Sequence, residues 1–128
     1  MLKSNVIMIV DDDEDDREFF CEALGNMNLE LKCLHVENGE KALQYLQDDE
    51  HVMPDYIFLD LNMPRLDGKE CLVAIKKIDH LKQVPVIIYS TSNHPLDKEQ
   101  TFQLGANGFI HKQTEFNSLC KELKQWLV

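Results

Sequence analysis

The sequence predicts an α/β domain with a doubly wound, five-stranded parallel sheet and helices on both faces. Five apolar runs, at residues 5–10, 32–36, 56–59, 84–89 and 108–111, alternate with amphipathic stretches. The first, third and fourth runs are nearly continuous in β-branched and aromatic residues, as expected of strands covered on both faces. With 128 residues, of which 44% are hydrophobic, the chain suits one compact domain.

Each stretch between or after the strands has features of a helix. The apolar stripes are Phe19, Phe20, Ala23, Leu24 and Met27, then Ala42, Leu43 and Leu46, then Cys71, Leu72, Ile75 and Ile78, and finally Phe116, Leu119, Cys120, Leu123, Trp126 and Leu127. Gly25 weakens the first helix near its end. The stretch 95–104 is the least amphipathic, but Pro95 suits the first position of a helix and marks its start.

The alternation of strands and helices implies right-handed crossovers and, for five strands, the order 2-1-3-4-5. In this order the first and third strands are neighbours, and ligands bind outside the carboxyl ends of the strands. We therefore expect Asp11 and Asp12, after the first strand, to meet Asp60, after the third. Ser90 and Lys112 end the fourth and fifth strands beside them.

The charge of the chain excludes several classes of partner. Thirteen basic and 23 acidic residues give a net charge of -10, which disfavours binding to nucleic acid and to anionic membranes. No apolar run approaches the roughly 20 residues of a membrane span. We therefore expect a cytoplasmic protein that binds neither nucleic acid nor membrane.

The cysteines predict no covalent framework. Cys21, Cys33, Cys71 and Cys120 are far apart in the sequence and form no CxxC pair. Three of them fall in apolar helical patterns. We therefore expect buried free thiols in a reducing compartment, and neither a disulfide framework nor a zinc site.

Three carboxylates at one sheet edge repel one another. Two unit charges about 4 Å apart cost roughly 4 kcal/mol at an effective dielectric near 20. Such a cluster should raise a pKa or bind a cation, and oxygen ligands favour Mg²⁺. The cation would permit phosphoryl transfer to a carboxylate because it neutralises the charge on the transferring group. Lys112 supplies a second positive charge, and the Ser90 hydroxyl can donate to a phosphoryl oxygen.

Each of these residues also has a simpler explanation. The acidic run 11–16 could be a solvated helix start, because acids favour helix N-termini. Ser90 could be a turn residue that caps the next helix, and a single lysine such as Lys112 is usually a surface residue. Complementary groups at four separate strand ends are harder to explain by chance, so we favour a functional site.

Three other motifs fail on inspection. Asp11, Asp13, Asp15 and Glu22 have the spacing of an EF-hand loop, but Asp16 stands where glycine is needed. The chain has no Walker A sequence and no GxGxxG. Phosphatases that use an Asp-x-Asp motif need a second acid two residues after the first, where this chain has an asparagine.

Taken together, the strand-end residues resemble the receiver domains of two-component response regulators. The matching segments span essentially the whole chain and are 10–12, 59–64 with Asp67-Gly68, 85–90 and 105–112. The strand order 2-1-3-4-5 is also the one known for such regulators, so the two expectations are not independent. Two features are similar to those of the small regulators associated with bacteriophytochromes, namely a lysine that is not followed by proline and the 90–92 segment.

The resemblance implies a phosphoacceptor and a magnesium site. Asp60 would accept a phosphoryl group from the phosphohistidine of a histidine kinase or phosphotransfer protein. Asp12, Asp60 and the backbone carbonyl of Asn62 would ligate Mg²⁺, and Asp11 would help through a water molecule.

The resemblance also implies a switch, with two departures from the family pattern. Ser90 and Lys112 would bind the phosphoryl group, and Ser90 and Phe109 would move together when the aspartyl phosphate forms. Phe109 lacks the hydroxyl of the commoner tyrosine, so the switch must work by packing. Gln113 replaces the proline that usually follows the lysine, often through a cis bond, and a cis bond to a non-proline residue costs about 2.5–4 kcal/mol.

These observations predict a receiver domain over residues 1–128, without an output domain. It would not be an enzyme beyond catalysing its own phosphorylation and dephosphorylation. Its output would be phosphorelay, or a surface change over residues 95–127 that binds a protein partner or forms a homodimer. The alternatives are an unphosphorylated binding module of the same fold and, from another class, a Mg²⁺-dependent phosphohydrolase.

Overall fold

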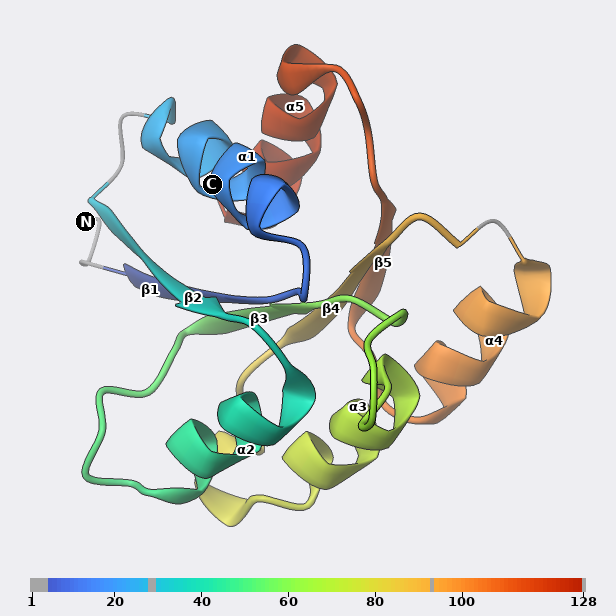
Figure 1. Ribbon diagram of the computed structural model, residues 1–128. Helices are drawn as coiled ribbons and strands as arrows, with labels where there is room; N and C mark the ends of the chain where they lie inside the picture. The colour runs from blue at the N-terminus through green and yellow to red at the C-terminus, as the bar shows by residue number, and fades with distance from the viewer. Residues whose placement is uncertain (1–4, 28–29, 93, 128) are drawn as a thin grey trace.

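The computed structural model describes residues 5–27, 30–92 and 94–127, in which strands and helices alternate along the chain (Figure 1). The strands are β1 (Asn5–Val10), β2 (Leu31–Val36), β3 (Tyr56–Leu59), β4 (Val86–Ser90) and β5 (Gly108–His111). The helices are α1 (Glu14–Gly25), α2 (Gly39–Gln47), α3 (Gly68–Lys76), α4 (Pro95–Gln103) and α5 (Phe116–Leu127), with a short 3-10 turn, η1 (Asp79–Leu81).

The sheet has the order β2-β1-β3-β4-β5, and its paired strands are parallel. Helices α1 and α5 cover one face, and α2, α3 and α4 cover the other (Figure 1). The predicted fold class and strand order are therefore confirmed. No α-helix in the described part of the chain is both long enough and apolar enough to cross a membrane.

A separate apolar core lies on each face of the sheet, and β1 contributes to both. Ile7 and Ile9 pack with the residues of α1 and α5, whereas Met8 and Val10 pack with those of α2 and α3. All four side chains are fully buried. This two-sided burial is the reason that the strand reads as a continuous apolar run, because neither set of alternate residues faces water.

Local signals place the first turns of the helices. Asp13 is the N-cap of α1 and accepts a hydrogen bond from the Asp16 N–H, so one acid of the run 11–16 serves the helix start, as the simpler explanation proposed. Asp67 forms a capping box with Glu70 at the start of α3. Pro95 occupies the first turn of α4, as predicted.

The expectation that all four cysteines are free thiols is wrong. Cys21 of α1 and Cys33 of β2 form a disulfide bond, whereas Cys71 and Cys120 are free and buried. The crossover from β1 to β2 lays α1 against the edge strand and brings the two sulfurs together. The separation of 12 residues between the two cysteines does not predict the disulfide, because the pairing depends on how the helix packs.

Candidate functional site

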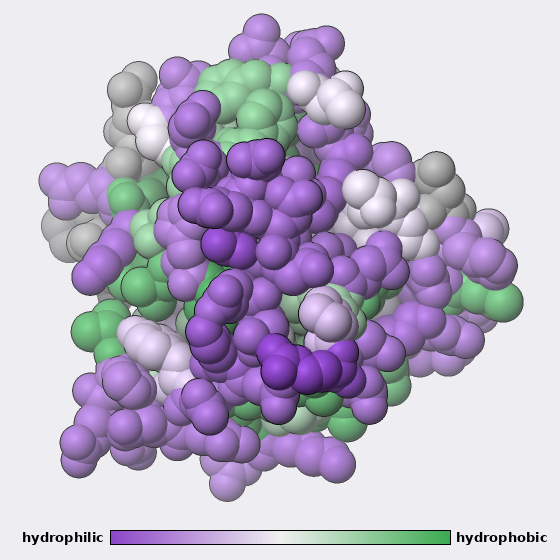
Figure 2. All heavy atoms as spheres, viewed as in Figure 1, coloured by the Kyte–Doolittle hydropathy of each residue, from purple (hydrophilic) through white to green (hydrophobic). Residues whose placement is uncertain are grey.

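The carboxyl edge of the sheet brings the three predicted acids together. Val10 pairs with Leu59 in register, so Asp11 and Asp60, the next residues of β1 and β3, leave the sheet side by side. Oxygens of Asp11, Asp12 and Asp60 all lie within 4.8 Å of one another. Asp11 and Asp60 are 0% and 3% exposed, and Asp12 is exposed. Hydrophilic side chains form most of the surface over this edge, in the middle of Figure 2.

Backbone hydrogen bonds fix the directions of the two buried carboxylates. The Asp60 N–H donates to the Val10 carbonyl oxygen with a distance of 3.0 Å, which ties the end of β3 to β1. The Asp13 N–H donates to Asp11 Oδ1 at 3.0 Å, and the Asn62 N–H donates to Asp60 Oδ1 at 3.3 Å. In each case the loop that follows the strand orients the carboxylate at its start.

Gly68 allows the loop after β3 to fold back against Asp60. Its N–H donates to the Leu61 carbonyl oxygen at 3.0 Å. A Cβ atom at this position would overlap the backbone carbonyl of Asp60 and the Cα of Leu61. Glycine is therefore required by close backbone approach, and the Asp67-Gly68 pair of the sequence serves both the helix cap and the position of Asp60.

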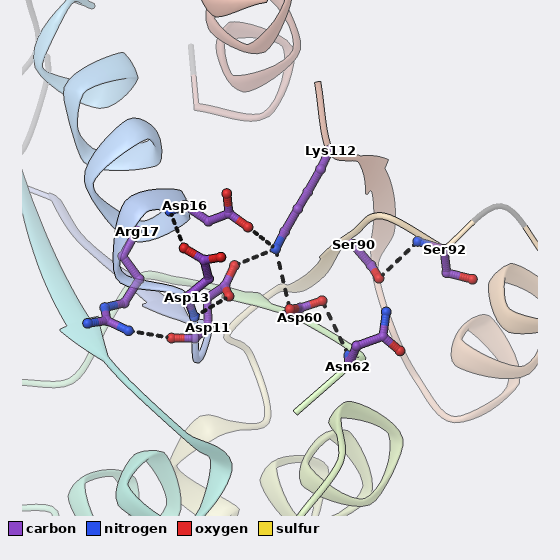
Figure 3. Close-up of polar contacts among 9 residues, drawn as sticks. All are labelled: Asp11, Asp13, Asp16, Arg17, Asp60, Asn62, Ser90, Ser92 and Lys112. Atoms are coloured by element: carbon purple, nitrogen blue, oxygen red, sulfur yellow. Dashed lines mark hydrogen bonds and ion pairs between the residues drawn. The ribbon is translucent and has the colours of Figure 1, made fainter. Parts of the chain in front are cut away.

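Lys112 places its ammonium group among three carboxylates. Nζ lies 2.7 Å from Asp11 Oδ2, 2.8 Å from Asp16 Oδ2 and 3.3 Å from Asp60 Oδ2, and the side chain is only 10% exposed. Figure 3 shows all three acids pointing toward it. The Lys112 N–H also donates to the Ser90 carbonyl oxygen at 2.8 Å, which fixes the lysine to the end of β4.

Burial and charge act in opposite directions in this cluster. Burial raises the pKa of Asp11 to about 6, and the negative charge of Asp60 adds to the effect, although Lys112 and the Asp13 N–H oppose it. Burial alone would lower the pKa of Lys112, but its contacts with Asp11 and Asp16 and the charge of Asp60 outweigh burial and raise that pKa. The lysine is therefore charged, and the acids carry an excess of negative charge.

Two residues of α1 take part in the cluster although the sequence reading did not assign them to it. Asp16, interpreted as part of a solvated helix start, is an ion-pair partner of Lys112. Arg17 Nη1 donates to the backbone carbonyl oxygen of Asp11 at 2.7 Å (Figure 3). The available signal was that both lie in the first turn of a helix that begins at the sheet edge, so their side chains can reach back to it.

Ser90 and Phe109 lie on the β4–β5 side of the cluster. Ser90 is fully buried, and its hydroxyl oxygen accepts a hydrogen bond from the Ser92 N–H at 3.2 Å. Figure 3 shows Asp11, Ser90, Asn62 and Lys112 arranged around Asp60. Phe109 is partly buried against the core of α2 and α3.

The departure from the family pattern after Lys112 has a simple geometry. No cis peptide bond occurs among the described residues, so the bond between Lys112 and Gln113 is trans. Gln113 Nε2 donates to Glu122 Oε1 of α5 at 3.2 Å. The lysine therefore reaches the three acids without a cis bond.

Known proteins share both this sequence pattern and this fold. Residues 7–124 match the family described as the response regulator receiver domain. The response regulator Rcp1 of Synechocystis is 30% identical over 120 residues, which cover 91% of this chain and 82% of Rcp1.

Solved structures agree with the family match. The phosphorylated cyanobacterial phytochrome response regulator RcpA is 32% identical, with a TM-score of 0.88, over 97% of this chain and 91% of RcpA. The Mn²⁺-bound form of Rcp1 is 29% identical, with a TM-score of 0.85, over 96% of this chain and 94% of that one. The match to the family spans most of the chain, and we conclude that this protein belongs to the response regulator receiver domain family.

Proposed function

We propose that this protein is a response regulator that accepts a phosphoryl group on Asp60 from a histidine kinase or a phosphotransfer protein. One observation carries the proposal. Asp60 is a nearly buried carboxylate with two further acids within 4.8 Å and the ammonium of Lys112 at 3.3 Å. This combination supplies a nucleophilic oxygen, a set of cation ligands and a positive charge at one point.

The ligand set suits a small divalent cation. Asp12, Asp60 and the backbone carbonyl of Asn62 would hold Mg²⁺, and Asp11 would act through a bound water. These are oxygen donors on two adjacent loops, which match the preference of Mg²⁺ for a few carboxylates and several waters. The Rcp1 structure with Mn²⁺ belongs to a protein that covers nearly all of this chain, which supports a divalent cation here. The cation would neutralise the negative charge of the transferring group.

The transfer would form one bond and break another. A carboxylate oxygen of Asp60 attacks phosphorus, the phosphorus–nitrogen bond of the phosphohistidine breaks, and the imidazole leaves with the bonding electron pair. Lys112 would turn from Asp11 and Asp16 toward a phosphoryl oxygen, since the new group carries nearly two negative charges. The Ser90 hydroxyl would donate to another phosphoryl oxygen, and Phe109 would repack as Ser90 moves.

Phosphorylation would change the surface formed by α4, β5 and α5, residues 95–127, and this change would transmit the signal. These elements adjoin Ser90 and Lys112, the two groups that move toward the phosphoryl group. A protein partner or a second copy of the chain would bind the rearranged surface, or the phosphoryl group would pass onward in a relay. Asn62 stands where phosphatases that use an Asp-x-Asp motif have a second acid, so hydrolysis of small phosphate esters has no general acid here.

The test is phosphorylation by a small phosphodonor. Acetyl phosphate with Mg²⁺ should add one phosphoryl mass to the wild type, measured by intact mass spectrometry, and a chelator should prevent the addition. Asp60→Asn should abolish it. Asp15→Asn, which removes an exposed acid of the same run, is the matched control and should behave like wild type. Equal phosphorylation of Asp60→Asn and wild type would refute the assignment.

A further inference from the structure

A second cluster of ligand-type side chains lies between α1 and the edge strand β2. It consists of Cys21 on α1 and of Cys33 and His35 on β2, whose ligand atoms all lie within 4.8 Å of one another. The Cα atoms of the two cysteines are 6.0 Å apart, and their sulfurs are bonded. The proposed phosphoryl transfer uses none of these three residues.

The fold builds this cluster from one strand face and one helix. Residues two apart on a strand point to the same face, so His35 follows Cys33 on the face that α1 covers. β2 is at the edge of the sheet, so α1 covers this face only in part. The two cysteines are half-buried and His35 is exposed. The cluster therefore lies at the surface of the molecule, with His35 open to solvent.

The other two cysteines provide an internal contrast. Cys71 and Cys120 are both buried. Burial raises the pKa of the Cys71 thiol to about 12, so that it stays protonated and unreactive. The Cys120 thiol contacts the backbone carbonyl oxygen of Ala23 at 3.9 Å within the core of α1 and α5. Neither belongs to the cluster around His35.

We propose that Cys21, Cys33 and His35 form a Zn²⁺ site when the two cysteines are reduced. Two thiolates and one imidazole are soft and borderline ligands that select zinc over magnesium or calcium. Three protein ligands leave one position of a tetrahedral zinc ion for water or for a group from another molecule. This chemistry differs from that of the carboxylate edge, where oxygen ligands favour a hard cation.

The disulfide and the metal are alternative occupants of the same sulfurs. A dithiol reductant supplies two electrons and two protons to the Cys21–Cys33 bond, which becomes two thiols while the dithiol becomes a disulfide. Zn²⁺ then displaces the two thiol protons and takes the His35 imidazole as its third ligand. Oxidation of the two thiols removes the site, so metal binding should depend on the redox state of this pair.

Cobalt substitution tests the site directly. Reduced protein is titrated anaerobically with Co²⁺ in excess Mg²⁺, which is added to compete with Co²⁺ for the carboxylate edge. Thiolate ligation gives Co²⁺ a charge-transfer absorption that oxygen ligands do not give. We expect about one equivalent of Co²⁺ with this absorption, displaced by Zn²⁺. Cys21→Ala and Cys33→Ala should lose it, His35→Ala should weaken binding, and Cys71→Ala and Cys120→Ala should keep it.

The wild type itself controls for misfolding of the variants. Oxidised wild type, with the disulfide intact, should show no thiolate absorption, and a dithiol should restore it in the same sample. The proposal is overturned if reduced wild type binds Co²⁺ without thiolate absorption or not at all, which would leave a disulfide alone. It is equally overturned if Cys21→Ala or Cys33→Ala binds as wild type does.

Discussion

Helices α4 and α5 precede and follow β5 in the chain, and they are held to the sheet in different ways. The inner side of α5 is fully apolar, with Leu119, Cys120, Leu123 and Leu127 buried. Within the described part of α4, only Thr101 is buried. Leu96, Phe102 and the flanking Leu104 are 52%, 43% and 37% exposed. Figure 2 shows apolar surface at the outer edge of α4, on the right of the view.

Polar contacts tether α4 where α5 uses apolar burial. Lys69 of α3 places Nζ 2.7 Å from Asp97 Oδ1 and 2.6 Å from Gln100 Oε1. The Ser92 hydroxyl donates to Asp97 from the loop that follows Ser90. The Lys69–Asp97 pair is partly open to solvent, and an ion pair of this kind contributes about 1 kcal/mol, whereas one buried leucine contributes about 1.5–3 kcal/mol. Displacing α4 should therefore need less free energy than displacing α5, and α4 is the helix connected to the proposed phosphoryl-binding residue Ser90.

The largest effect should come from matched leucine deletions in the two helices. Leu123→Ala in α5 should lower the free energy of unfolding by about 2–5 kcal/mol, because it leaves a cavity in the core. Leu96→Ala in α4 should change it by less than about 0.5 kcal/mol, because the side chain already contacts water. Urea denaturation of both variants measures the difference. Equal losses would show that α4 is packed as firmly as α5.

Sequence reasoning captured the part of the molecule that depends on periodicity and topology. The strand order and the meeting of Asp11 with Asp60 follow from which runs are strands and how parallel strands connect. The contacts of Asp16, Lys69 and Cys21 could not be predicted in this way. They depend on how far a side chain reaches between two elements, which periodicity does not encode.

The low amphipathicity of residues 95–104 was visible in the sequence, but its meaning was not. A weak stripe is compatible with a helix that is poorly packed or with no helix at all. The structure shows a helix that is poorly packed. It buries only Thr101 among its described residues, and Lys69 contacts Asp97 and Gln100 on it. The sequence contains each of these polar residues but not their proximity.

Lys112→Ala tests the contribution of the carboxylate cluster, independently of how α4 and α5 pack on the sheet. Removal of the ammonium leaves Asp11, Asp16 and Asp60 without their shared cation, so the variant should be less stable than wild type in chelator, by about 1–3 kcal/mol. Mg²⁺ should recover much of this loss, because the carboxylates remain. The phosphoryl mimic beryllofluoride should no longer shift the NMR signals of α4. A response of α4 equal to that of wild type would exclude the lysine from signalling.

The cost of burying the ionised Asp11 carboxylate, to which the charge of Asp60 adds, can be measured apart from helix packing. The pKa of Asp11 is raised from 3.8 to about 6 in the folded protein, so its ionised form opposes folding. This cost is absent below pH 3.8, grows as the pH rises to about 6, and is complete above it. In chelator, Asp11→Asn should therefore exceed wild type in stability by about 1–2 kcal/mol at pH 7.5 and match it near pH 4. A pH-independent difference would contradict this.

The smallest expected effect is on the tether itself. Lys69→Ala should raise amide exchange in α4 by up to about fivefold, the equivalent of about 1 kcal/mol, while the exchange of α5 and the global stability stay unchanged. Lys98→Ala, which removes an exposed lysine of α4, is the matched control and should leave exchange as in wild type. If both variants behave alike, the Lys69 contacts do not hold the helix.

Hydrogen exchange with and without beryllofluoride and Mg²⁺ tests the central claim most directly. The claim is that a phosphoryl group at Asp60 changes the conformation of α4, the helix that buries little apolar surface. Protection should change most in residues 95–103, less in β5 and α5, and not at all in Asp60→Asn. Changes confined to the loop 60–68, or larger in α5 than in α4, would contradict the account.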